Sequence, residues 1–215
     1  DRFDYKTWMK THSNYLESEL IDGANNIGCM EEERYQVFEK QFQVSNEEKN
    51  YVIKVLAESS QEAVGSMGDD TPMAVLSRQV RPLYDYFRQQ FAQVTNPPID
   101  SIRENIVMSL ETCLGAEQNL FEEKPEYAQR LMVDSPVLSA DKFEKLLRLD
   151  DDKYRFALLD LSFNQQTTLK QAVEDLCNKA VDVVKSGHVV LILDDKNIAK
   201  DKLMIHALMA TGAIH

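Results

Sequence analysis

Two apolar stretches near the end of the chain decide the fold: Phe156-Ala-Leu-Leu-Asp-Leu-Ser-Phe163 and Val189-Val-Leu-Ile-Leu193. The second is nearly all apolar, as a strand covered on both faces should be, and the first is also predicted to be a strand. Between them, Thr168 and Gln171 form a capping box that predicts the start of a helix. The apolar residues of that helix recur at the spacing of one helical face: Leu169, Ala172, Val173, Leu176, Cys177, Ala180, Val181 and Val184.

Gly187 suits the position just past the end of this helix, where glycine is favoured. Asp194-Asp195 ends the second strand, and a further helix is predicted to begin near Leu203. Strand, helix, strand and helix in this order predict a parallel crossover unit, which is right-handed in nearly all proteins. The residues therefore predict an α/β fold with a parallel sheet and flanking helices.

The amino-terminal part, residues 1–60, is predicted to be helical. Tyr35, Phe38 and Phe42 fall on one face of a helix, and Ser45 with Glu48 forms a capping box that opens the next one. The composition changes near Glu62, where small and turn-forming residues become frequent, so residues 61–215 are predicted to form the α/β domain.

In two segments of residues 61–215, small, polar and proline residues predict the local backbone structure. Val64-Gly-Ser-Met-Gly-Asp-Asp-Thr-Pro72 is a loop, and a helix with Pro82 in its first turn is predicted to run through Val94. Thr95-Asn-Pro-Pro-Ile-Asp100 stops that helix, because a residue before proline is pushed to an extended conformation.

The charge balance bears on the partners. The 215 residues include 24 Lys and Arg against 36 Asp and Glu, a formal net charge of -12. Such a field repels the phosphates of nucleic acids and anionic lipids, and no basic cluster offsets it. The longest apolar run, Val189 to Leu193, is far too short to span a bilayer. We therefore expect neither a nucleic-acid nor a membrane partner.

The cysteines and the first residues bear on the compartment. Cys29, Cys113 and Cys177 are an odd number without C-x-x-C spacing, which argues against a disulfide framework and a zinc site. A reducing cytoplasm is the simplest location. Asp1-Arg-Phe-Asp4 is neither a signal nor a transit peptide, and the absence of an initial Met suggests an excised piece.

The motifs of common active sites are missing from this sequence. No glycine lies between Phe163 and Thr168, so a dinucleotide fingerprint fails, and Gly65-Ser-Met-Gly68 lacks the G-K-[ST] ending of a phosphate loop. The histidines show no metal-binding spacing. Catalytic, cofactor-binding and metal-binding residues are therefore predicted to be absent from the chain.

The paired carboxylates leave one catalytic alternative open. Asp69-Asp70 suits a loop with a cap, and Asp150-Asp-Asp152 suits a solvated turn. Asp194 and Asp195 have more weight, because α/β proteins build their sites at the carboxyl ends of parallel strands. A free-standing α/β enzyme or an interaction module with a carboxylate site at this strand end is thus the alternative function.

Two longer motifs resemble the central domain of the large (alpha) subunit of bacterial glutamate synthase. They are Glu62-Ala-Val-Gly-Ser-Met-Gly-Asp-Asp-Thr-Pro-Met-Ala-Val-Leu-Ser77 and Leu83-Tyr-Asp-Tyr-Phe-Arg-Gln-Gln-Phe-Ala-Gln-Val-Thr-Asn-Pro-Pro-Ile-Asp100. Shorter matches extend the similarity to nearly the whole chain: Tyr5-Lys-Thr-Trp8, Val107-Met-Ser-Leu-Glu-Thr112, Ser135-Pro-Val-Leu138 and the stretch from Tyr154 to His215.

The resemblance implies a domain within a larger enzyme that converts glutamine, 2-oxoglutarate and a reductant into two glutamates. It implies a degenerate or incomplete TIM-barrel-like fold, similar to an FMN barrel, with residues 1–60 as the helical linker after the glutaminase domain. The chain ends at His215, short of the family's domain, so the sheet is expected to lack its closing strands.

The implied partners are the glutaminase and FMN domains of the same polypeptide, and a small reductase subunit is an open further partner. FMN and an iron-sulfur cluster belong to the full enzyme and none is expected in this chain, which is predicted to be inactive alone. Because an interdomain surface and an unfinished sheet would be uncovered, we expect the isolated chain to expose a large apolar patch and to self-associate.

One motif is carried over from the family as a wall of its ammonia tunnel: Thr95, Asn96, Pro97, Pro98 and Ile99. Two prolines stiffen the backbone and lack N–H donors that would trap a polar guest. The alternative is a rigid helix stop without further function. The loop residues Gly65, Ser66, Gly68, Asp69, Asp70 and Thr71 are the second candidate, as an interdomain contact.

Overall fold

The computed structural model describes residues 4–16, 30–59, 75–78, 81–87, 99–119, 121–122, 124–134, 136, 138–149 and 151–215. They fall into two units that alternate along the chain. The first unit comprises residues 1–25, 112–133 and 139–215, and the second comprises 26–111 and 134–138.

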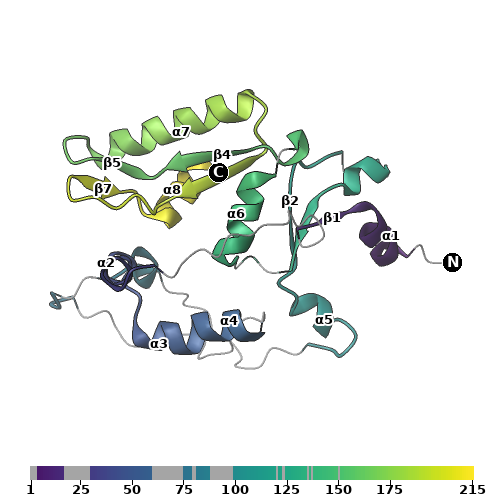
Figure 1. Cartoon of the computed structure of the whole chain (residues 1–215), viewed down its shortest axis with the longest axis horizontal. Coiled ribbons are helices and arrows are strands. Elements are labelled where there is room, and N and C mark those ends of the chain that lie inside the picture. The colour runs from purple at the N-terminus through teal and green to yellow at the C-terminus, as the bar shows by residue number, and fades with distance from the viewer. Residues whose placement is uncertain are drawn as a thin grey trace. The chain divides into compact units, whose positions relative to one another are not determined.

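The first unit contains two parallel strands connected by a long helix (Figure 1). Strands β4 (Phe156–Asp160) and β6 (Val190–Asp194) pair in parallel, with Leu158 beside Ile192. Helix α7 (Leu169–Lys185) begins where Thr168 Oγ1 accepts a hydrogen bond from the Gln171 N–H, at 3.3 Å. The predicted strand–helix–strand order is therefore confirmed, although the first strand ends at Asp160 rather than at Phe163.

Helix α7 ends in the way its glycine predicts. Gly187 has φ 93°, a left-handed conformation that glycine adopts without steric cost. Its N–H donates to the Val184 carbonyl at 3.0 Å, and the His188 N–H donates to the Val183 carbonyl at 3.3 Å. This pair of bonds is the Schellman motif, which satisfies carbonyls that the last turn leaves without partners.

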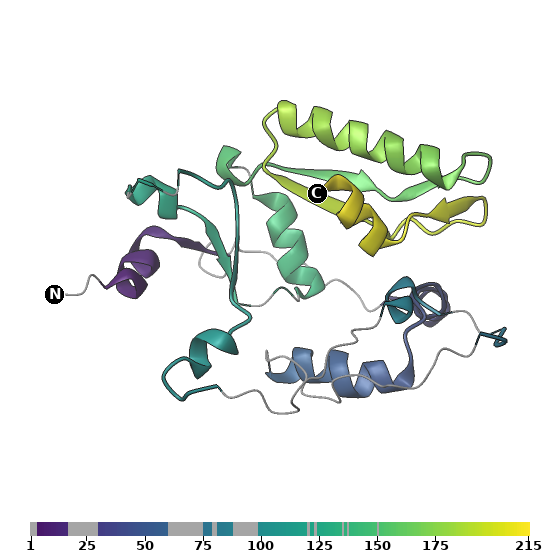
Figure 2. The same cartoon turned by 180° about the vertical axis from the view of Figure 1, so that it is seen from behind.

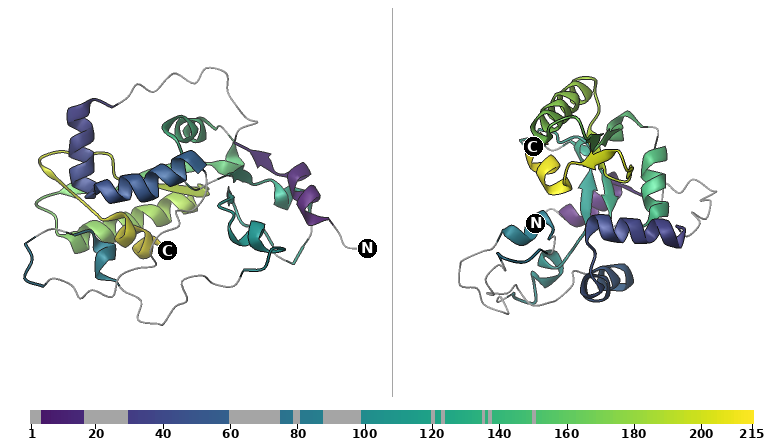
Figure 3. Two further views of the ribbon diagram at one scale, coloured as in Figure 1. Left: turned by 90° about the horizontal axis from the view of Figure 1, so that it is seen from below. Right: turned by 90° about the vertical axis from the view of Figure 1, so that its left-hand side faces the viewer.

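The core of this unit joins the two strands to α7 and to α8 (Ala207–Ile214), which lie together in Figure 3. Small side chains on both helices allow a close approach to the strands. The buried members are Leu159, Leu161, Ala172, Leu176, Ala180, Ile205 and Ala210.

The prediction that the second strand is covered on both faces was wrong, and other apolar residues of this unit are also exposed to solvent. Leu158 is 42% exposed, and Val181 and Val184 are 49% and 53% exposed, so one strand face and one edge of the helical face keep apolar area in contact with solvent. The β6 residues Val190–Asp194 are half-buried rather than fully covered. The apolar spacing identifies the helix but does not say how wide a stripe its neighbours cover.

A short antiparallel pair follows the parallel one. Strands β5 (Ser162–Asn164) and β7 (Lys202–Met204) place Phe163 beside Leu203. The helix predicted to begin near Leu203 therefore begins later, at Ala207, after His206 Nδ1 has accepted a hydrogen bond from the Leu208 N–H at 3.2 Å. The ladder with β5 holds residues 202–204 extended, and this long-range pairing overrides local helical preference.

A second sheet in the same unit brings together distant parts of the chain (Figure 2). Strand β1 (Asn14–Tyr15) pairs in parallel with β3 (Leu131–Val133), which pairs antiparallel with β2 (Thr112–Leu114). The adjoining helices are α1 (Tyr5–His12), the 3-10 helices η3 (Pro125–Ala128) and η4 (Asp152–Tyr154), and α6 (Ala140–Arg148).

Tyr154 connects this sheet to the amino-terminal segment. Its side chain is only 2% exposed. Its hydroxyl accepts a hydrogen bond from Asn14 Nδ2 at 2.6 Å and donates one to the Gln129 carbonyl at 3.3 Å. One buried side chain thus holds both β1 and the end of η3 against residues 152–154.

The second unit is helical in its described part. Ser45 Oγ accepts a hydrogen bond from the Glu48 N–H at 3.1 Å, which confirms that a helix begins at Ser45 and forms one of the two bonds of the predicted capping box. Phe38 and Phe42 lie 5.9 Å apart between ring centroids on one helix, as their spacing predicts. The elements are α2 (Glu32–Phe42), α3 (Asn46–Glu48), the π-helix η1 (Lys49–Ile53), α4 (Lys54–Ser59), the 3-10 helix η2 (Leu83–Tyr86) and α5 (Glu104–Val107).

The helix predicted from Pro82 to Val94 was wrong in its described part. Residues Leu83–Tyr86 form one 3-10 turn, and Phe87 is extended, with φ -105° and ψ 120°. Tyr86 and Phe87 are 61% and 71% exposed, so these two aromatic side chains have little packing that would hold the segment in a helix. Residues 88–98 lie outside the described part of the chain.

The parallel β4–β6 pair with its connecting helix agrees with an α/β assignment. The barrel-like sheet and the domain boundary between residues 60 and 61 stay predictions. Among the described residues, no helix combines the length and the apolar character needed to cross a membrane.

Candidate functional site

Most of the predicted site residues lie outside the described part of the chain. This holds for Thr95, Asn96, Pro97 and Pro98 of the predicted tunnel wall. It also holds for the predicted interdomain loop, which comprises Gly65, Ser66, Gly68, Asp69, Asp70 and Thr71. Ile99 is described, and its side chain is 38% exposed.

Asp100 fixes the backbone directly after Ile99. Its Oδ1 accepts hydrogen bonds from the N–H groups of Ile102 and Arg103 at 3.0 and 2.9 Å, and its Oδ2 pairs with Arg103 Nε at 2.5 Å. The Arg103 side chain, followed by these N–H groups, lowers the pKa of Asp100. The ionised carboxylate thus holds a tight turn that leads into α5 and sets the position of Ile99 at its start.

Asp194 and Asp195, the strand-end carboxylates of the alternative function, lie beside a third carboxylate, Asp160. Asp160 and Asp194 are register partners at the carboxyl ends of β4 and β6, and Asp195 follows directly. Each of the first two has cationic or amide partners: Asn197 Nδ2 donates to Asp160 Oδ2 at 2.9 Å, and Lys196 Nζ lies 3.3 Å from Asp194 Oδ2. Asp160 was not singled out in the sequence, although its place at the end of the first strand was a usable signal.

The protonation of these carboxyls is set by different forces. Burial opposes the ionisation of Asp160, but hydrogen bonds from Asn197 and Ser162 and the charge of Lys202 outweigh it, so its pKa is lowered. Burial, with the neighbouring charge of Asp194, raises the pKa of Asp195, while its own backbone N–H and His206 oppose that shift. In the described part of the chain, no three side chains of His, Cys, Asp or Glu form a group suited to a metal ion.

Two histidines and one cysteine make contacts within their own parts of the fold. His12 Nδ1 lies 2.8 Å from the Trp8 carbonyl, and His188 Nδ1 lies 3.1 Å from the Val183 carbonyl at the end of α7. Cys177 Sγ donates to the Ala213 carbonyl at 3.3 Å. Cys177 is half-buried, so it is less enclosed than its place on the apolar helix face predicts.

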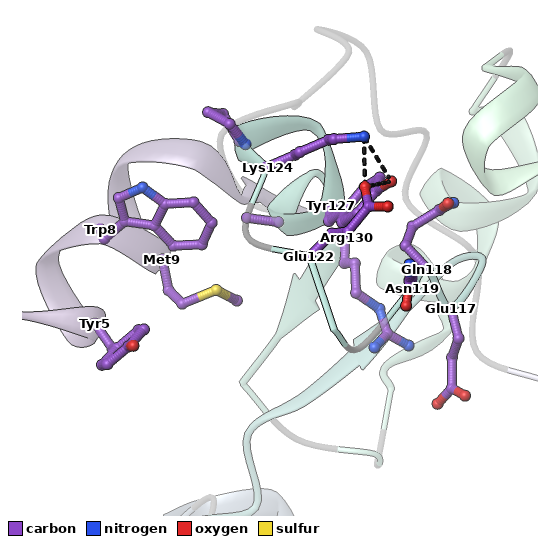
Figure 4. Close-up of a pocket in the computed structure, with 12 residues that line it drawn as sticks. Tyr5, Trp8, Met9, Glu117, Gln118, Asn119, Glu122, Lys124, Tyr127 and Arg130 are labelled. Atoms are coloured by element: carbon purple, nitrogen blue, oxygen red, sulfur yellow. Dashed lines mark hydrogen bonds and ion pairs between the residues drawn. The ribbon is translucent and has the colours of Figure 1, made fainter.

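A pocket beside α1 was not predicted from the sequence. It has a volume of about 500 Å³ and lies between α1 and residues 117–130 of the first unit. Figure 4 shows Tyr5, Trp8 and Met9 on one side and Lys124, Tyr127, Glu122, Arg130 and Gln118 on the other. The signal that was available is the chain's single tryptophan, next to a methionine on a short helix.

Hydrogen bonds and charge pairs build the polar side of this pocket. Lys124 Nζ pairs with Glu122 Oε2 at 2.5 Å, and the Tyr127 hydroxyl donates to the same carboxylate at 3.0 Å. The Lys124 ammonium and the Tyr127 hydroxyl lower the pKa of Glu122. Arg130 Nη2 reaches the Gly115 carbonyl at 3.5 Å, and its buried Nε has no hydrogen-bond partner in the described part of the chain.

Comparisons with known proteins identify the family. The family model described as the glutamate synthase central domain matches residues 38–215. The ferredoxin-dependent glutamate synthase of Oryza sativa is 38% identical over 98% of this chain, which covers 13% of that protein. The NADPH glutamate synthase large chain of Azospirillum brasilense is 36% identical over 98% of this chain, and 14% of the large chain is covered.

A fungal relative is also a glutamate synthase, and this chain again covers only a small part of it. The NADH glutamate synthase of Schizosaccharomyces pombe is 38% identical over 79% of this chain, which covers 8% of it. The chain therefore spans between 8% and 14% of the length of these relatives.

Proposed function

The chain belongs to the glutamate synthase central domain family, and we propose that it is the domain that links a glutaminase domain to a flavin domain. The whole enzyme converts glutamine, 2-oxoglutarate and a reductant into two glutamates. Ammonia released from glutamine reaches the flavin domain through an internal tunnel, which this domain helps to wall. The domain itself holds no catalytic residue in this proposal.

The observation that carries the proposal is that the alignments cover almost all of this chain but only a small part of its relatives. Relatives named as glutamate synthases match 98% of this chain, while the chain matches only 13% or 14% of them. A match of this kind fits one domain of a much longer polypeptide. The reaction chemistry is then divided over domains that lie elsewhere in that polypeptide.

The engaged carboxylates support a role without chemistry for this domain. Asp160 and Asp194 are each occupied by Asn197, Lys196 or Lys202 within 4 Å. A general acid or base needs a free proton-transfer position toward a substrate. The contacts made by Asp160 and Asp194 instead tie the ends of β4 and β6 to the loop before β7.

The tunnel role rests on the Thr95 to Ile99 motif. A path for ammonia needs few charges and few donors, because a guest that is held tightly or protonated does not pass on. Two prolines and an isoleucine meet that need. Asp100 anchors the turn behind them through Arg103 and two backbone N–H groups, so the wall has a fixed end.

Within this family, we assign the chain more specifically to the large subunit of a bacterial glutamate synthase. The identity to the Azospirillum brasilense large chain is 36%, beside 38% to the Oryza sativa protein. FMN and an iron-sulfur cluster belong to the flavin part of the enzyme, outside this chain. A small reductase subunit is the further partner in the NADPH-dependent form.

The coding sequence on both sides of this segment tests the domain assignment directly. The proposal expects a glutaminase before it and a flavin domain after it; stop codons on both sides contradict it. A second test is made on the chain alone. Flavin titration and a glutaminase assay are expected to show neither binding nor turnover, and saturable micromolar flavin binding would overturn the assignment.

A further inference from the structure

We propose that the pocket between α1 and residues 117–130 binds a small monocarboxylate with a flat apolar body. Its volume of about 500 Å³ lies within the range of small-molecule sites. One side is apolar and aromatic, and the other is polar, as Figure 4 shows. This arrangement suits a ligand with one apolar face and one charged end.

Arg130 is the group that receives the carboxylate. Its Nε is buried without a hydrogen-bond partner in the described part of the chain, and its Nη2 makes only a 3.5 Å contact with the Gly115 carbonyl. The enclosed Nε is not reached from the pocket, but the side chain as a whole is half-buried and lines it, which leaves the two Nη groups to receive the ligand. The planar guanidinium matches a carboxylate with two parallel hydrogen bonds.

The other cation of the pocket, Lys124, is already occupied. It pairs with Glu122 at 2.5 Å and lies 3.4 Å from the Tyr127 hydroxyl. Glu117 also lines the pocket and is exposed, so it would repel a second negative charge on the ligand. One cation with open donors and one exposed carboxylate favour a monocarboxylate over a dicarboxylate such as the substrate and product of the proposed reaction.

The apolar body of the ligand lies against α1. Trp8 and Met9 are half-buried there, and Tyr5 adds an edge that is 56% exposed. The Trp8 ring is oriented by His12, whose ring centroid lies 4.8 Å away at an interplanar angle of 32°. An indole face held in this way is a stacking surface for a planar group.

Trp8 also reports on the pocket directly, because it is the single tryptophan of the chain. Phenylacetate is titrated into the 215-residue chain, with excitation at about 295 nm, where the indole is excited selectively. We expect a saturable change in Trp8 emission in the millimolar range or below. Phenylacetamide, which has the same shape without the charge, and acetate, which lacks the ring, are expected to bind at least tenfold more weakly.

The variant Arg130→Gln removes the charge and keeps a polar side chain, which is shorter than that of arginine. We expect it to weaken phenylacetate binding at least tenfold, so that phenylacetate and phenylacetamide bind the variant with equal affinity. The control Arg148→Gln changes an arginine on α6 that pairs with Glu144 at 2.9 Å and does not line the pocket, so binding stays unchanged. Equal binding of acid and amide by the unmodified chain, or no saturable change, overturns the proposal whether or not the variants fold.

Discussion

Tyr154→Phe tests the attachment of the amino-terminal segment to the first unit. The substitution removes one hydroxyl from a side chain that is 2% exposed and changes its volume little. That hydroxyl serves two segments, accepting from Asn14 Nδ2 at 2.6 Å and donating to the Gln129 carbonyl at 3.3 Å. Its loss leaves a donor on β1 and an acceptor at the end of η3 without this partner.

The expected cost follows from the two bonds. A hydrogen bond contributes about 0.5–1.5 kcal/mol net, and a buried group left without its partner costs about 1–3 kcal/mol. Because both bonds are part-buried, we expect Tyr154→Phe to lower the free energy of unfolding by about 1–3 kcal/mol. For a protein of this size, each 1 kcal/mol corresponds to a fall in Tm of about 2–4 °C.

Denaturant unfolding followed by Trp8 fluorescence measures this cost within the first unit. Tyr127→Phe is the matched control, since its hydroxyl bonds to the exposed Glu122, which keeps its ion pair with Lys124; we expect a loss below about 0.5 kcal/mol. In an Asn14→Ala background, the effect of Tyr154→Phe should shrink, because the shared bond is already gone. Equal losses for Tyr154→Phe and Tyr127→Phe would refute the reasoning.

Two further predictions concern the α7 core and the strand-end carboxyls. Leu159→Ala, at a position that is 0% exposed, should cost about 2–5 kcal/mol in the free energy of unfolding, whereas Leu158→Ala on the 42% exposed face should cost clearly less; equal losses would contradict the assigned core. Asp195 has a raised pKa, so its ionisation disfavours the fold as pH rises through that pKa, and Asp195→Asn should stabilise at pH 7 by an amount that shrinks toward pH 4. Asp160 has a lowered pKa, so the stability that its ionised form contributes is complete above about pH 4 and is lost only as pH falls through the lowered pKa. Asp160→Asn should therefore lower the free energy of unfolding at pH 7. If pH-dependent unfolding gave Asp160→Asn and Asp195→Asn a stability change of the same sign, these environments would be contradicted.

The elements that could be predicted from the sequence are those whose signals are local. Thr168 and Gly187 mark the two ends of α7, and Ser45 marks the start of α3, because capping bonds join neighbouring residues. The β4–β6 pairing could also be inferred, since a helix between two apolar strands leaves a parallel crossover as the common solution.

The elements that were missed depend on distant partners. Strand β1 is two residues long and is extended because it pairs with Leu131–Met132, which no local pattern indicates. Residues Lys202–Met204 pair with Ser162–Asn164 instead of starting the last helix. The pocket beside α1 is likewise formed by segments far apart in the sequence, so Trp8 could be noticed but its opposite wall, with Arg130, could not.

The central claim is that Ile99 borders the path of ammonia, and Ile99→Lys in the intact enzyme tests it most directly. A cation placed beside that path is costly to desolvate and blocks passage or opens a leak, while both active sites stay untouched. Ile102→Lys, at a position that is 88% exposed in the same turn, is the control for added charge. The measurement is the ratio of glutamate formed to glutamine hydrolysed. We predict that this ratio falls from two toward one in Ile99→Lys, with ammonia released to solvent, and that it stays at two in Ile102→Lys. An unchanged ratio in a well-folded Ile99→Lys enzyme would contradict the tunnel role and leave the segment as a plain helix stop.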